Sequence, residues 1–185
     1  MPVEVEKRLI NVEEYYKMAE VGILKTDDRV ERINGEIYEM SPIGSKHAAI
    51  VNRLARQLNI LFEKQATIGV QSPVRLDNKN EPEPDISILK FRSDDYSGSH
   101  PSVSDILLVI EVADSSVKYD KNVKMSFYAS FGIPEYWIVD IDANAIEVFK
   151  RPGSKAYDEK QIFKPFDIID ILGKTLVVKQ ILILD

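Results

Sequence analysis

The sequence has no cysteine and only two histidines, and this removes several kinds of chemistry. Without cysteine, the 185-residue chain can form no disulfide, no thiolate nucleophile and no thiolate-ligated metal site. His47 and His100 are too few for a histidine-rich zinc site. The phosphate-binding P-loop, the dinucleotide-binding glycine pattern, the zinc-protease helix motif and the serine-hydrolase elbow are also missing from the sequence. Carboxylate and lysine chemistry remains.

Long apolar segments are absent as well. No run approaches the roughly 20 residues that a bilayer span requires. The first ten residues carry charges throughout and lack the apolar core of a signal peptide. We therefore expect a cytoplasmic protein without membrane contact. Residues 1–185 are expected to form a single domain, because a chain of this length can bury about 70% of its unfolded surface.

The chain also lacks an excess of basic residues. It has 24 basic and 30 acidic side chains, which gives a net charge of −6. A broad nucleic-acid binder needs a basic surface that displaces counterions, so this composition disfavours one. It leaves open an enzyme with a small basic cleft, since a carboxylate site for divalent cations would itself add negative charge.

The first half of the chain predicts two helices separated by a β-hairpin. Asn11 is the expected N-cap of a short helix, with a capping box. Apolar and polar residues alternate around Asn34 and Gly35, a strong signal for a tight hairpin. Ser45 is the expected N-cap of a long amphipathic helix over residues 45–65, whose apolar residues recur at helical spacing.

The second half is rich in predicted strands. An edge strand or a bulge is expected near Pro73, followed by a short strand that begins at Asp85. Residues 106–112 are the most apolar segment and predict a central strand. A helix is expected at 117–132, and further strands at 134–141, 145–151, 160–164 and 175–184. This order predicts a mixed-sheet α/β or α+β fold.

One feature of the central strand requires an explanation, because the apolar run Ile106–Ile110 ends in the carboxylate of Glu111. Either this strand end reaches solvent, or Glu111 has a cation as partner, since an unpaired buried carboxylate is costly. If the strands of Asp85 and Glu111 are antiparallel neighbours, the two carboxylates meet at one edge of the sheet. Two such groups repel unless a cation or a shared proton relieves them, and paired oxygen ligands suit Mg²⁺.

These residues resemble a nuclease motif. Pro84-Asp85 followed by Glu111-Val112-Ala113 resembles the PD-(D/E)xK nuclease superfamily, although Ala113 occupies the position of the usual lysine. Nearly the whole chain resembles the Uma-type restriction endonuclease family, in "RINGEIYEMSP", "EPDISI", "LLVIEVADSS" and "YDKNVKMSFYASFGIPEYWIVD". The resemblance implies a restriction-endonuclease-like mixed central sheet flanked by helices, with a β-rich N-terminal hairpin and C-terminal strands. It also implies metal-dependent hydrolysis of DNA.

The resemblance also implies roles for individual residues. Asp85 and Glu111 would hold Mg²⁺, with Mn²⁺ as a substitute, and Lys124 on the following helix would replace the missing lysine. Glu36 would lie near the site, and Gln71 would orient the attacking water. A solvated turn explains Glu36 equally well, and a polar residue at a sheet edge is the commoner explanation of Gln71.

Three further residues are candidates for contacts with phosphate or substrate. They are His47, Lys121 and Lys118. Each also has an ordinary explanation, which is helix capping or packing for the histidine and a solvated helix end for the lysines. The aromatic side chains of Tyr119, Tyr128, Tyr136 and Trp137 are assigned to packing and not to base stacking.

Two classes of function therefore remain. The retained Asp85, Glu111 and Lys124 favour a metal-dependent endonuclease acting on DNA. The negative net charge and the alanine at position 113 favour a catalytically inactive protein of the same fold, acting as a dimeric binding or regulatory scaffold. The apolar late strands, with little helical sequence to cover them, predict a homodimer in either case.

Overall fold

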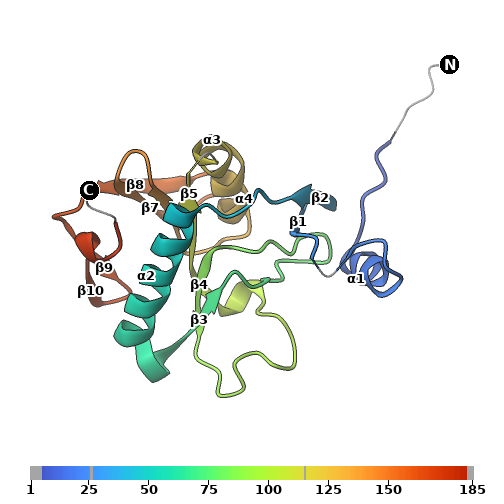
Figure 1. The fold of residues 1–185 in the computed structure, drawn as a ribbon, viewed down its shortest axis with the longest axis horizontal. Helices are drawn as coiled ribbons and strands as arrows, with labels where there is room; N and C mark the ends of the chain where they lie inside the picture. Colours follow the sequence, from blue (N-terminus) through green and yellow to red (C-terminus); the bar gives the residue numbers. More distant parts are fainter. Residues whose placement is uncertain (1–5, 26, 115, 183–185) are drawn as a thin grey trace.

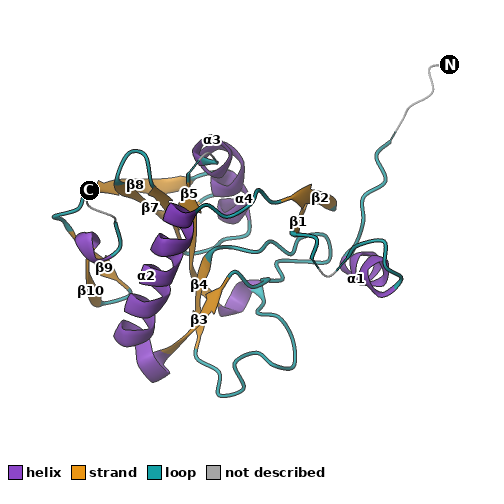
Figure 2. Cartoon of the chain, viewed as in Figure 1, coloured by secondary structure: helices purple, strands orange, loops and turns teal. Residues whose placement is uncertain are grey.

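The computed structural model describes residues 6–25, 27–114 and 116–182. Its centre is a six-stranded mixed sheet with helices packed on both faces. In Figure 1 an N-terminal helix and hairpin lie at one end of the molecule, and a C-terminal hairpin lies beside the long helix at the other. Figure 2 separates helices from strands in the same view. The predicted mixed α+β architecture, with N-terminal hairpin and C-terminal strands, is confirmed.

The strand order brings together the two strands that carry the predicted acids. Ile86 pairs with Ile110 in antiparallel register, as predicted for the neighbours of Asp85 and Glu111. Among the described strands of this sheet, β5 and β6 form the one parallel pair, and every other neighbouring pair is antiparallel. In spatial order the sheet consists of β3 (Ala66–Val70), β4 (Ile86–Lys90), β5 (Ile106–Ala113), β6 (Glu135–Asp140), β7 (Ala145–Pro152) and β8 (Tyr157–Phe163). The strand of Glu111 is therefore central, and the strand before Pro73 lies at an edge, as expected.

The long helix α2 (Ser45–Phe62) covers one face of the sheet. Its side chains Leu54 and Leu58 are fully buried against residues of β4, β5 and the C-terminal segment. The prediction that Ser45 caps this helix is wrong. The chain arrives extended at Gly44, which is the N-cap and provides no side-chain hydrogen bond, and Ser45 is already the first helical residue.

A helix that changes type halfway along covers the other face. It consists of α3 (Val117–Tyr119), the π-helical turn η3 (Asp120–Lys124) and α4 (Met125–Ser130). Tyr128, Tyr136 and Trp137 are fully buried, in agreement with their assignment to packing. A π-helical turn inside a helix often marks a functional site, and here Lys124 is its last residue.

The N-terminal elements are α1 (Val12–Glu20), β1 (Val30–Ile33) and β2 (Glu36–Glu39). The predicted capping box at Asn11 and the predicted hairpin are both confirmed. Asn34 and Gly35 have φ values of 55° and 73°, the left-handed backbone that a tight two-residue hairpin turn requires. β1 is buried along its whole length, and Arg32 forms a β-bridge with Glu81 in the loop before β4. The hairpin is thereby fixed next to the central sheet.

We predict that Gly35→Ala destabilises the fold more than Gly173→Ala. Both glycines have positive φ, 73° and 77°, in hairpin turns. A Cβ at position 35 would lie 2.8 Å from the Cβ of Leu9, whereas nothing lies within 4 Å of a Cβ at position 173. We expect a loss of about 1 kcal/mol for the control and a larger loss for Gly35→Ala, measured by urea unfolding. Equal losses would show that Leu9 yields without cost.

The C-terminal segment differs from its prediction. The expected strand over 175–184 ends early, because β10 (Lys174–Val177) is followed by the 3₁₀ turn η4 (Val178–Gln180), and residues 183–185 lie outside the described residues. β9 (Ile168–Ile171), which pairs with β10, was not predicted from the sequence. The apolar residues Val178, Ile181 and Leu182 pack into the core of their own chain. The homodimer remains a prediction. It was based on uncovered apolar residues in the late strands, and these three residues are covered within the chain itself.

No helix within the described ranges combines the length and apolar character that a bilayer crossing demands.

Candidate active site

The alternation of β5 decides where Glu111 points. Successive side chains of a strand face opposite sides of a sheet, so Ile110 and Val112 contact the α2 side while Val109 and Ala113 face the other helix. Glu111 therefore points away from α2, toward η3 and α4. The Glu111 side chain is only 6% exposed. It is thus not a strand end in solvent, and it needs partners.

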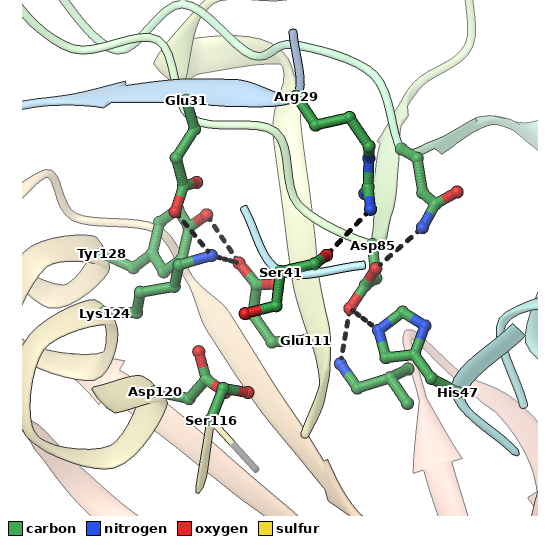
Figure 3. A network of polar contacts seen from close by, with 12 residues as sticks. Arg29, Glu31, Ser41, His47, Asp85, Glu111, Ser116, Asp120, Lys124 and Tyr128 are labelled. Atoms are coloured by element: carbon green, nitrogen blue, oxygen red, sulfur yellow. Dashed lines mark hydrogen bonds and ion pairs between the residues drawn. The ribbon is translucent and has the colours of Figure 1, made fainter. Parts of the chain in front are cut away.

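The partners of Glu111 come from the helix on that side. Lys124 Nζ donates to Glu111 Oε1 over 3.1 Å, and the Tyr128 hydroxyl donates to the same oxygen over 3.1 Å (Figure 3). Both side chains are buried, and they lie one helical turn apart. The lysine that is missing at position 113 thus has a counterpart beside the carboxylate, supplied by the following helix.

A second carboxylate, not predicted from the sequence, shares the same lysine. Glu31 Oε1 lies 3.2 Å from Lys124 Nζ, with Glu31 reaching down from β1 (Figure 3). The family resemblance indicated Glu36, five residues further on, as the acidic residue near the site. One signal in the sequence could have identified Glu31. It is an acidic residue in the middle of a short predicted strand, and a strand with one buried and one open face does not explain its position. β1 is buried on both of its faces, so Glu31 is inside.

Asp85 immediately precedes β4 and has its own set of donors. Asp85 Oδ2 accepts from the backbone N–H of Val112 over 2.9 Å and lies 3.0 Å from His47 Nε2. Its other oxygen accepts from Gln71 Nε2 over 3.2 Å. The predicted residues His47 and Gln71 both contact Asp85 directly. Burial raises the pKa of Asp85, but the bond and charge of His47, with the Val112 and Gln71 bonds, outweigh it, so the pKa lies below its usual value. The same bond raises the pKa of His47.

The cluster around Lys124 contains more acidic than basic side chains. Burial, reinforced by the charges of Asp85, Asp120 and Glu31, raises the pKa of Glu111 to about 8, although Lys124 acts in the opposite direction. Burial also raises the pKa of Asp120, despite a bond from Ser116 and the nearby lysine. Burial lowers the pKa of Lys124, but the surrounding carboxylates, led by Glu111, raise it well above its ordinary value. One ammonium does not neutralise these carboxylates.

These groups line one pocket with a volume of about 370 Å³. The hairpin and the segment that follows it form one side, and the end of β5 with the helix after it forms another. The basic side chains at its surface are those of Arg29, His47 and Lys124. The acidic ones are more numerous: Glu31, Glu39, Glu83, Asp85, Glu111, Asp114 and Asp120.

The residues present suit a divalent cation with oxygen ligands. Within the described part of the chain, no three His, Asp or Glu side chains are already arranged as a complete metal cage. Mg²⁺ does not need one, because it keeps several waters and is usually bound by one or two carboxylates. Glu31 Oε2 is buried without a hydrogen-bond partner among these residues, and the excess of carboxylates leaves charge for a cation to offset. Asp85 and Glu111 are the residues that would hold it.

Four of the predicted residues do not line the pocket. Gln71 still contacts Asp85, and the other three are Glu36, Lys121 and Lys118. Glu36 bonds to Lys7 and to the hydroxyl of Tyr38. Lys121 lies 2.8 Å from Glu147 and 3.2 Å from Asp140 in a separate ion-pair network, and Lys118 is exposed. None of the three lines the pocket of Asp85 and Glu111.

The chain is similar to a described protein family and to solved structures. The family Uma2, described as "Putative restriction endonuclease", matches residues 12–174. A crystal structure from Anabaena variabilis, described as that of "a putative nuclease belonging to DUF820", is similar with a TM-score of 0.69. The two sequences are 18% identical, and the similarity covers 93% of this chain and 97% of the other. No curated protein matches the chain. The solved structure supports the fold, and the family match covers most of the chain.

Proposed function

Because the chain belongs to the Uma2 family of putative restriction endonucleases, we propose that it is a Mg²⁺-dependent endonuclease that hydrolyses phosphodiester bonds in DNA. The observation that carries this proposal is the contact of 3.1 Å between Lys124 Nζ and Glu111 Oε1, in a pocket that also contains Asp85. It joins the two acids and the lysine of the nuclease motif in one place, with the lysine on the helix and not on the strand.

Each residue has a separate task in this proposal. Asp85 and Glu111 would hold the cation, which would supply Lewis acidity toward water and offset charge on the phosphate. Lys124 donates to a phosphate oxygen and stabilises the negative charge that grows there during attack. Mn²⁺ is expected to replace Mg²⁺, since both accept carboxylate ligands.

The neighbouring residues position these groups. Tyr128 donates to Glu111 and fixes the carboxylate on the sheet side of the pocket. Glu31 holds the ammonium of Lys124 from the opposite side. His47 and Gln71 orient Asp85, each bonding a different oxygen. Because bonds to His47 and Val112 engage one oxygen of Asp85, the oxygen facing Gln71 is the better candidate to bind a cation.

An inactive scaffold is the second candidate. The observation in its favour is that Lys124 is engaged by two carboxylates, in a pocket whose surface is mainly acidic. Such a surface repels a polyanion unless cations are bound. The homodimer belongs to both proposals, and sedimentation at micromolar concentration would test it.

We expect the wild-type protein to cleave DNA only when Mg²⁺ or Mn²⁺ is present, and Asp85→Asn to abolish this cleavage. Asparagine keeps the size of the side chain but removes the charge that holds the cation. The measurement is conversion of supercoiled plasmid, with and without EDTA, together with melting temperatures over a Mg²⁺ titration. A cation that binds only the folded state raises the melting temperature. If no divalent ion produces cleavage or stabilisation, the scaffold is favoured.

A further inference from the structure

Lys124, which would contact the phosphate, lies at the bottom of the pocket together with the acids beside it. The side chains of Lys124, Glu111 and Glu31 are 9%, 6% and 5% exposed. A phosphate contacts Lys124 only if it enters the pocket, because a convex surface resting on the rim does not reach atoms at this depth. The substrate backbone must therefore be inserted.

Residues 40–44, which follow β2 and form one side of the pocket, are held in place at both ends. The N–H of Met40 donates to the Arg29 carbonyl over 2.8 Å, and the Arg29 guanidinium donates to the Ser41 carbonyl over 3.0 Å. At its other end the segment passes through Gly44 directly into α2, where the N–H of Ala48 donates to the Gly44 carbonyl. Figure 3 shows Arg29 reaching across to Ser41 above Glu111 and Asp85. This fixed segment limits the width of a substrate that can enter the pocket.

The size of the pocket is that of a small-molecule site. Its volume of about 370 Å³ lies near the lower end of the roughly 300–1,000 Å³ that such sites occupy. Sites that bind duplex DNA instead bury roughly 1,000–2,500 Å² of protein surface along the helix. The pocket has room for a unit the size of one nucleotide, and not for two paired strands.

Two aromatic rings line the same pocket. Tyr38 comes from the hairpin and Tyr119 from α3, and their ring centroids are 6.3 Å apart. The Tyr119 hydroxyl is buried and has no hydrogen-bond partner among the described residues. Unpaired bases stack on aromatic side chains with little regard to sequence, and an unbonded hydroxyl is available to a base edge or a phosphate oxygen. The assignment of Tyr119 to packing leaves this hydroxyl unexplained.

Resting on the proposed nuclease function, we infer that the substrate is single-stranded DNA, or a stretch of duplex whose bases are unpaired. One phosphodiester is inserted toward Lys124, and the adjoining base stacks on Tyr119. The acidic pocket surface favours the same choice, because a paired second strand would bring further phosphates close to its carboxylates. The inference specifies the substrate class of the proposed site.

The test compares one fluorescein-labelled DNA strand in three forms: alone, annealed to its full complement, and annealed to a strand that leaves a central bubble. In Mg²⁺ or Mn²⁺ we expect the single strand and the bubble to be cut at least about tenfold faster than the full duplex, within the range that one base–aromatic stack supplies. Fluorescence anisotropy in Ca²⁺ should show the same order of affinities. Equal or faster cleavage of the full duplex, or equal affinities, would overturn the inference.

Variants of Tyr119 separate stacking from a general loss of structure. Tyr119→Ala should reduce cleavage of the single strand about tenfold, mainly through a higher KM. Tyr119→Phe keeps the ring and loses only the hydroxyl contact, so it should lose less activity than Tyr119→Ala. Phe166→Ala is the matched control, because it removes an aromatic side chain that is 82% exposed and does not line the pocket. If no DNA is cut at all, the proposed function fails, while anisotropy still decides whether unpaired DNA is preferred.

Discussion

Lys124→Met is expected to abolish cleavage. At a pH above about 8, where Glu111 is ionised despite its raised pKa, it should also destabilise the metal-free protein by about 3–5 kcal/mol, the cost of removing one partner from a buried ion pair. Methionine keeps much of the length of the side chain but removes the ammonium that lies near both Glu111 and Glu31. The two carboxylates then face each other, buried and without a cation. Because the Lys124 side chain is only 9% exposed, its replacement should change the melting temperature as well as the activity.

Divalent cations should partly repair the stability of Lys124→Met without restoring its activity. A cation bound between the acids offsets the charge that the ammonium had offset, so Mg²⁺ should raise the melting temperature of the variant more than that of the wild type. Cleavage does not return, since no group remains to donate to the phosphate. Plasmid nicking and thermal unfolding, each with and without Mg²⁺, measure both effects.

Lys121→Met is the matched control for this experiment. It removes the same charge three residues earlier, from a lysine that is paired with Asp140 and Glu147 outside the pocket. We expect it to retain cleavage. The assignment of the lysine would be wrong if Lys124→Met were active and Lys121→Met inactive.

The sequence was sufficient to predict the parts of the site that depend on local patterns. An apolar run ending in Glu111 and an acid at the start of a neighbouring strand follow from strand periodicity and antiparallel pairing. The position of Lys124 followed from the family pattern. In each case the signal lay within a few residues of the side chain concerned.

Glu31 could not be predicted in the same way, because its partner is distant in sequence. Its contact with Lys124 depends on how the hairpin packs against the helix after β5, and no local pattern determines that packing. The π-helical turn could not be predicted for the same reason. Its local sequence is equally compatible with an ordinary α-helix. The strand prediction for the C-terminal segment was wrong for another reason. A short apolar run is compatible with a strand and with a buried turn equally well.

The wild-type protein should lose stability as the pH rises from about 4.5 to about 8, and Mg²⁺ should reduce this loss. The pKa of Glu111 is raised by burial to about 8 from the ordinary value of 4.5. Between these values the folded protein retains a proton that the unfolded chain releases, so each pH unit costs up to about 1.4 kcal/mol for one such group. The raised pKa values of Asp120 and His47 act in the same direction. The lowered pKa of Asp85 gives stability that is lost only at lower pH, below this window.

Glu111→Gln isolates the contribution of this carboxyl group. Glutamine resembles the protonated form at every pH, so the variant should show a flatter profile than the wild type between pH 5 and pH 8, and it should gain less from Mg²⁺. In the wild type the cation competes with the proton, and its stabilising effect should therefore be largest near pH 8 and smallest near pH 5. Melting temperatures across this range, with and without Mg²⁺, give both slopes. Identical slopes for the two proteins would mean that Glu111 is already ionised in the folded state, with Lys124 sufficient to keep its charge.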